Sequence, residues 1–79
     1  MSKTRTIDDV ITAARGAGDE PCVWVGDAGG GAADVLIYAT AEDCAADRDN
    51  SGAAARLSTA DGEALIAALI DAGIDYERG

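Results

Sequence analysis

Residues 22–40 constrain the fold of this chain more than any other stretch, because they hold its only two runs dense in β-branched and aromatic side chains. These runs cover 22–25 and 34–39, and four of the eight residues between them are glycine. Such a segment is too flexible to continue either strand and is suited to a loop. Phosphate-binding loops lead into a helix and usually carry a lysine, whereas this loop leads into a second strand and has no lysine. The sequence therefore predicts a β-hairpin whose loop, 26–33, is not a phosphate site.

Two long amphipathic helices are predicted, one on each side of the hairpin in sequence. Thr6 is a suitable N-cap for the first helix, which ends at the glycines of 16–18. The second helix is predicted over 60–72, with Ser58 and Thr59 as its cap and a glycine after its last residue. The apolar positions with helical spacing are Ile7, Val10, Ile11 and Ala14 in the first helix, and Leu65, Ile66, Leu69 and Ile70 in the second.

The remaining segments complete an α+β prediction. A short helix is expected over 40–46 and a third strand over 53–58. The order α-β-β-(short α)-β-α predicts a three-stranded antiparallel sheet with two main helices. The whole chain, 1–79, is interpreted as one domain with loose ends at 1–5 and 77–79.

Both faces of the predicted strands are apolar. In the first strand, Val23 and Val25 point to one face while Cys22 and Trp24 point to the other. Either one helix lies on each side of the sheet, or the face that carries Trp24 is left for a partner. A two-sided core is favoured because a chain of 79 residues has few large apolar side chains. For the same reason, a homodimer that hides more apolar surface would supplement this thin core.

The charge of the chain is extreme for its size, at −9. Residues 19–49 carry −7 of this, with eight acidic residues and one basic residue. A field of this sign repels nucleic acid and anionic membranes, and it attracts basic protein surfaces or cations. The competing explanation is background acidity, because much alanine and glycine, with five arginines against one lysine, suggests a GC-rich coding sequence.

Features of catalysis are missing from the sequence. There is no histidine, which removes the commonest general base and the usual zinc ligand. Neither Cys22 nor Cys44 has a basic neighbour in sequence to lower its pKa, so both are interpreted as free thiols of a reducing compartment. No apolar run approaches a membrane span, and no signal peptide follows the basic N-terminus. We expect a cytoplasmic protein that is not an enzyme and carries no cofactor.

One short motif resembles a metal site. Asp47, Asp49 and Ser51, followed by glycine, match the first six positions of an EF-hand calcium loop. The match then fails, because position eight is Ala54 and position twelve is Ser58, where a branched apolar residue and a bidentate glutamate belong. These three residues are therefore a weak calcium candidate, and an ordinary turn is the competing reading.

The acidic middle of the chain is the main candidate site. Carboxylates on a rigid body can occupy a groove lined by lysine and arginine in place of nucleic-acid phosphates. The predicted partner-binding residues are Asp19, Glu20, Asp27, Asp34, Glu42, Asp43, Asp47 and Asp49, with Trp24 as an apolar addition.

In size, acidity and absence of catalytic residues, the chain resembles the small phage-encoded anti-CRISPR proteins, in particular those that act on type I-C systems. The resemblance spans the whole length and rests on this profile, with no diagnostic motif, so it carries no residue roles over. It implies an inhibitor that binds a CRISPR surveillance complex and blocks its DNA groove. The alternatives are a small homo-oligomeric structural or accessory domain and a weak calcium-binding module.

Overall fold

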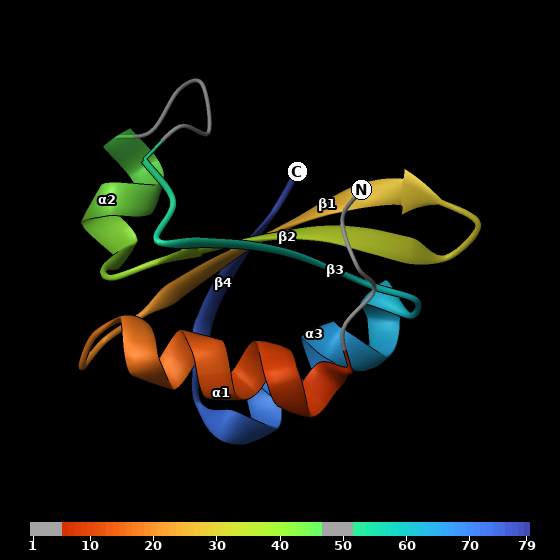
Figure 1. Ribbon diagram of the computed structural model, residues 1–79, viewed down its shortest axis with the longest axis horizontal. Helices are drawn as coiled ribbons and strands as arrows, with labels where there is room; N and C mark the ends of the chain where they lie inside the picture. Colours follow the sequence, from red (N-terminus) through yellow and green to blue (C-terminus); the bar gives the residue numbers. More distant parts are fainter. Residues whose placement is uncertain (1–5, 47–51) are drawn as a thin grey trace.

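The computed structural model describes residues 6–46 and 52–79, and these form a four-stranded mixed sheet with three helices (Figure 1). The α+β class predicted from the sequence is thereby confirmed. The elements in chain order are α1 (Ile7–Ala17), β1 (Cys22–Gly29), β2 (Ala32–Tyr38), α2 (Ala41–Ala46), β3 (Ala55–Thr59), α3 (Gly62–Ala72) and β4 (Asp75–Arg78).

The sheet contains one strand more than the sequence predicts. Its order is β3-β2-β1-β4, and β4 pairs in parallel with β1 while the other neighbours are antiparallel. The prediction of three antiparallel strands and a loose end at 77–79 was therefore wrong in this detail. After β3 at one edge, α3 carries the chain across the sheet to the opposite edge, where β4 lies along β1. Gly79 continues this pairing, because its N–H donates to the carbonyl of Val25 at 2.8 Å.

The hairpin loop is much tighter than predicted. The two strands run on through most of 26–33 and leave only Gly30 and Gly31 between them. The backbone has positive φ at Gly29, Gly30 and Gly31, with values of 89°, 63° and 85°. Glycine is the residue that adopts this region without strain, so three consecutive glycines permit the tight turn. The pairing register shifts between Asp27 and Gly29, as in a β-bulge.

The N-cap predicted for the first long helix is confirmed, and the one predicted for the second is not. Thr6 caps α1 as predicted, and its hydroxyl accepts from the Asp9 N–H at 3.2 Å while the Asp9 carboxylate accepts from the Thr6 N–H at 3.3 Å. The predicted cap of the second long helix was wrong. Asp61 is the N-cap of α3, and its carboxylate accepts from the Ala64 N–H at 3.1 Å. Ser58 and Thr59 instead belong to β3, which begins and ends slightly later than the predicted strand over 53–58.

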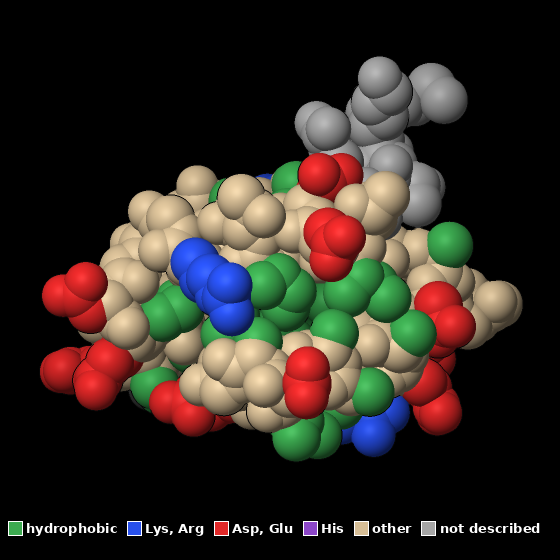
Figure 2. Space-filling view, turned by 90° about the horizontal axis from the view of Figure 1, so that it is seen from below, with side chains coloured by type: hydrophobic (Ala, Val, Ile, Leu, Met, Phe, Trp, Pro, Cys, Tyr) green, Lys and Arg blue, Asp and Glu red, His purple; other side chains and the backbone are tan. Residues whose placement is uncertain are grey.

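Two separate apolar clusters lie on the two faces of the sheet. Both long helices, α1 and α3, pack against the same face, where the larger cluster contains Val10, Val23, Val35, Ile37, Leu65 and Leu69. On the opposite face, the short helix α2 covers a smaller cluster made of Cys22, Leu36, Tyr38 and Cys44. The core is thus two-sided as favoured, although both long helices occupy one side. Figure 2, which views the helix side, shows hydrophobic side chains in the middle of this face with acidic ones around them.

Candidate functional site

Thr40 brings two of the predicted acidic pairs to the same end of the sheet. It forms an isolated parallel bridge with Glu20, which follows Asp19 in the segment before β1. The Thr40 hydroxyl also accepts from the Asp43 N–H at 3.1 Å and so caps the first turn of α2, where Glu42 and Asp43 lie. One residue therefore joins the segment that carries Asp19 and Glu20 to the helix turn that carries Glu42 and Asp43.

Strand β4 adds two carboxylates that sequence reasoning did not select. Asp75 pairs in register with Cys22, and Glu77 pairs with Trp24. Since Tyr76 packs against the helix-side cluster, Asp75 and Glu77 project from the opposite face, on which α2 lies. Glu77 Oε2 lies 3.9 Å from the Cys44 Sγ, which places this carboxylate against α2. We call the combined surface the acidic end; its residues are Asp19, Glu20, Glu42, Asp43, Asp75 and Glu77.

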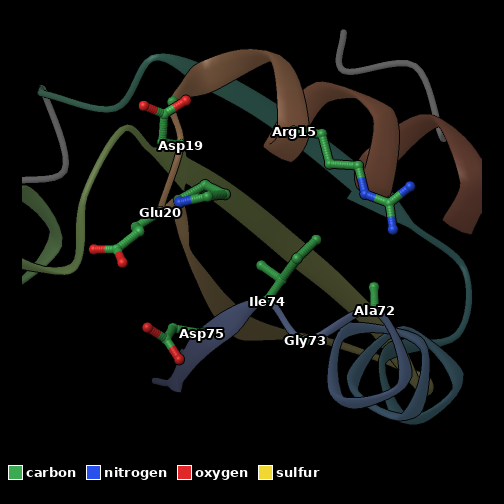
Figure 3. Close-up of a pocket in the computed structure, with 9 residues that line it drawn as sticks. Arg15, Asp19, Glu20, Ala72, Gly73, Ile74 and Asp75 are labelled. Atoms are coloured by element: carbon green, nitrogen blue, oxygen red, sulfur yellow. The ribbon is translucent and has the colours of Figure 1, made fainter.

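A hollow of about 480 Å³ lies beside the acidic end, between the end of α1 and the start of β4. It is lined on one side by Asp19, Glu20 and Asp75, and Arg15 contributes the basic group. Figure 3 shows the carboxylates of Glu20 and Asp75 projecting to the same side, with the Arg15 guanidinium at the other side of the hollow. The carboxylates are therefore presented outward as a group, and Arg15 does not sit among them.

Asp27 and Asp34 lie apart from the acidic end. Both lie near the hairpin turn, where Asp34 is the register partner of Gly26 and Asp27 is the register partner of Ala33. The Asp27 carboxylate accepts from the Gly29 N–H at 2.8 Å, so part of its hydrogen-bonding capacity stabilises the turn. Asp34 is exposed on the same sheet face as Leu36. The structure thus places six of the predicted acidic residues, those within the described ranges, in two groups at opposite ends of β1.

Trp24 lies on the α2 side of the sheet and is half-buried. Its indole ring covers Gly26 and Gly79, and a Cβ added at either glycine would overlap the ring. The ring therefore fills the space over two glycines, which have no side chains of their own. It extends the small cluster beyond the area that α2 covers. Part of its surface remains accessible beside Glu77, its register partner on β4.

The two cysteines are buried and free. Burial raises the pKa of the Cys22 thiol, while a hydrogen bond from Cys44 acts in the opposite direction. Burial also raises the pKa of Cys44 to about 12, and its hydrogen bond to Cys22 and the nearby Glu77 carboxylate add to this increase. At neutral pH both groups are thiols, which are poor nucleophiles and poor metal ligands.

The calcium candidate, formed by Asp47, Asp49 and Ser51, lies outside the described residues. Asp47 and Asp49 were also predicted to bind a partner, so that part of the prediction lies outside the described residues too. Within 6–46 and 52–79, no group of three or more cysteine, aspartate or glutamate side chains is arranged to hold a metal ion. None of the helices in the same ranges is long and apolar enough to cross a membrane.

Comparison with known proteins gives no relative from which a function could be carried over: no family model, curated protein or solved structure matches the chain.

The signal that could have revealed Asp75 and Glu77 is short. Gly73 ends α3 in the left-handed conformation at φ 71°, and Ile74 then returns to the core. Asp75, Tyr76 and Glu77 alternate polar, apolar and polar, which is the pattern of a half-buried strand. Only the pairing with β1 makes so short a segment a strand.

Proposed function

We propose that this chain is a non-enzymatic binding protein whose acidic end docks onto a basic surface of a nucleic-acid-handling protein and inhibits it. The observation that carries the proposal is the convergence of carboxylates from the segment before β1, from α2 and from β4. In the ranges 6–46 and 52–79, no hydrogen bond or ion pair engages the carboxylates of Asp19, Glu20, Glu42 and Asp43. They can bind lysine or arginine without breaking a contact among the described residues, which favours charge-assisted pairing with a partner.

The sheet and its caps support this proposal by fixing where the carboxylates lie. Asp75 and Glu77 belong to a strand, and the turn of α2 is tied through Thr40 to the segment before β1. A preorganised array loses little conformational entropy on binding, and it can match a groove built to hold regularly spaced phosphates. Binding of this kind weakens as salt screens the charges.

The specific form of the proposal follows from the resemblance to anti-CRISPR proteins: the partner would be a CRISPR surveillance complex, and binding would block its DNA groove. The test uses a purified type I-C complex, labelled target DNA and a mobility-shift assay. Preincubation with the chain should abolish the DNA-bound band, and inhibition should decline at higher salt.

A pair of charge reversals separates the acidic end from overall charge. Glu42→Lys with Asp43→Lys changes the first turn of α2, and Asp8→Lys with Glu63→Lys changes the first turns of α1 and α3. Each pair moves the net charge from −9 to −5. We expect the first pair to weaken inhibition at least about tenfold, which is roughly 1.4 kcal/mol, and the second pair to change it little.

Equal losses for both pairs would show that net charge alone acts, and full inhibition by the first pair would remove α2 from the interface. If the complex binds DNA normally with the unmodified chain present, the CRISPR form of the proposal is wrong. Affinity capture on the unmodified chain and on the first pair, followed by identification of basic proteins, then tests the wider proposal.

Ile70 favours a second candidate, a homo-oligomeric structural domain. It is 62% exposed on α3, whereas the other large hydrophobic residues in the described part of the chain are at least partly covered. It lies on the helix side of the sheet, where Figure 2 shows hydrophobic side chains in the middle of the surface. Sedimentation of the unmodified chain and of Ile70→Lys tests this alternative. A strict monomer at all concentrations would contradict it.

A further inference from the structure

Two cysteines that are far apart in the sequence meet where α2 packs on β1. Cys22 is 1% exposed and Cys44 is 7% exposed, and both belong to the cluster that α2 covers. Cys44 is the buried residue of α2, so its side chain is the contact that seats this short helix on the sheet. Each thiol influences the pKa of the other, and the Cys44 S–H has Glu77 Oε2 as an acceptor at 3.9 Å.

We propose that Cys22 and Cys44 form a redox latch, in which a peroxide oxidises the paired thiols to a disulfide that joins β1 to α2. A disulfide requires sulfur atoms about 2.05 Å apart and side chains that point toward each other. Both cysteine side chains belong to the same small buried cluster between α2 and β1, so they enter the same space from the two elements. The proposal stands on this shared burial of the two thiols and does not depend on the proposed function.

The chemistry balances with hydrogen peroxide as the oxidant. The sulfur of Cys22 attacks one peroxide oxygen, the O–O bond breaks, and the products are a sulfenic acid on Cys22 and one water. The sulfur of Cys44 then attacks the Cys22 sulfur and breaks the S–O bond; the departing hydroxide takes the Cys44 proton and leaves as a second water. The two thiols together lose two electrons and two protons, and the peroxide is reduced to two waters.

The order of attack follows from the surroundings of the two sulfurs. The Cys44 S–H can donate to a thiolate on Cys22 and stabilise it, whereas Cys44 itself, with a pKa of about 12, stays protonated. Because both thiols are buried and protonated at neutral pH, the reduced form should react more slowly than an exposed cysteine. The rate should increase as the pH rises toward the pKa of Cys22.

The element that this latch would fix is α2. It spans only Ala41–Ala46, and the described contacts that hold it include the Thr40 cap and the Cys44 side chain. A covalent bond to β1 would prevent the helix from lifting off the sheet. If the proposed function is correct, oxidation would also fix Glu42 and Asp43 in their positions at the acidic end.

The test treats the reduced, folded chain with hydrogen peroxide near pH 8 and follows its intact mass. We expect the loss of two hydrogen atoms, a monomer on a non-reducing gel, and a peptide map that links Cys22 to Cys44. Dithiothreitol should reverse the change. The thermal midpoint of the oxidised form should be higher by roughly 10 °C, as expected for a disulfide across a loop of this length in a small domain. The chain has two cysteines, so an intramolecular disulfide has one possible pairing.

Cys22→Ala and Cys44→Ala are matched controls, because each leaves one thiol in the same cluster. They should gain oxygen atoms or form dimers, with no increase in the thermal midpoint. Three results with the unmodified chain would overturn the proposal. In the first, the folded chain keeps both thiols under conditions in which a urea-unfolded sample forms the disulfide. In the second, the folded chain gains oxygen atoms instead of losing two hydrogens. In the third, the disulfide forms but lowers the thermal midpoint. These readouts need no variant and no partner, so they are independent of the binding test above.

Discussion

The indole of Trp24 lies directly over Gly26, two residues further along β1 on the same face of the sheet, and leaves no room for a side chain there. A Cβ at Gly26 would overlap two atoms of the six-membered ring. Gly26→Ala should therefore push the ring away from the sheet and lower the free energy of unfolding by about 1–3 kcal/mol. Fluorescence reports this directly, because the chain has a single tryptophan. Its emission should shift to longer wavelength in Gly26→Ala, and in a Trp24→Leu background the same glycine substitution should cost much less. Equal costs in the two backgrounds would contradict the contact.

Replacement by alanine should change the stability in opposite directions at Gly16 and at Gly18. An added Cβ at Gly16, within α1, meets nothing within 4 Å, whereas one at Gly18 would lie 2.6 Å from the carbonyl oxygen of Ala39. Gly16→Ala should stabilise the protein by about 0.5–1 kcal/mol through helix propensity. Gly18→Ala should destabilise it by about 1–3 kcal/mol, because backbone has to move. Urea unfolding of both variants measures the difference, and the same sign for both would contradict the packing of Gly18 against Ala39, the residue that follows β2.

Asp61 is expected to carry the cap of α3. Asp61→Ala removes the acceptor for the Ala64 N–H and should lower the stability by about 1 kcal/mol, with Asp61→Asn restoring most of it. Ser58→Ala is the control, since Ser58 lies in β3 and does not cap the helix. Circular dichroism during chemical unfolding gives the comparison; a larger loss for Ser58→Ala would favour the helix start predicted from the sequence.

Leu69 and Ile70 are neighbours on α3 with opposite environments. Leu69 is fully buried, and Ile70 is 62% exposed. Leu69→Ala should lower the free energy of unfolding by about 2–5 kcal/mol because it leaves a cavity between α3 and the sheet. Ile70→Ala removes a side chain of similar size and should change stability by less than about 0.5 kcal/mol in dilute solution. A large loss for Ile70→Ala that depends on protein concentration would instead reveal an interface between copies.

The raised pKa of Cys44 should make the protein less stable as the pH rises above 9. Its pKa is raised from 9.0 to about 12 in the folded chain, so above pH 9 the unfolded state loses a proton that the folded state keeps. The stability from this group is fully present below pH 9 and is lost as the pH rises toward 12. Under reducing conditions, urea unfolding of the unmodified chain should lose roughly 1 kcal/mol per pH unit more than Cys44→Ala over this range. Parallel slopes would show that the thiol is not protected by burial.

The local part of the fold could be predicted from the sequence because its signals lie within a few residues. The threonine cap and apolar spacing of α1 define that helix from neighbouring residues alone. The hairpin follows equally from two β-rich runs around glycines, although the length of its turn does not. Strand β1 continues to Gly29 because pairing with β2 offers backbone hydrogen bonds that a flexible segment would otherwise leave to water.

Only part of the acidic end could be predicted from signals that lie within a few residues of each other. The sequence marked Asp19, Glu20, Glu42 and Asp43 by charge, but nothing in the sequence shows that Thr40 joins the two pairs. Asp27 and Asp34 carry the same charge and lie at the far end of β1. Charge is a property of each residue, whereas its position on a surface depends on which distant segments pair.

Local sequence patterns were enough to predict the α+β class, the long helices and the hairpin, and the net charge of −9 follows from composition alone. Three features depend on long-range packing instead: β4 runs parallel to β1, both long helices share one face, and Cys44 joins Cys22 in the cluster under α2. The physical reason is the range of the interactions. Helix caps, helical spacing and tight turns are satisfied within a few residues, while strand pairing and buried contacts are set by burying apolar surface from segments far apart in the chain.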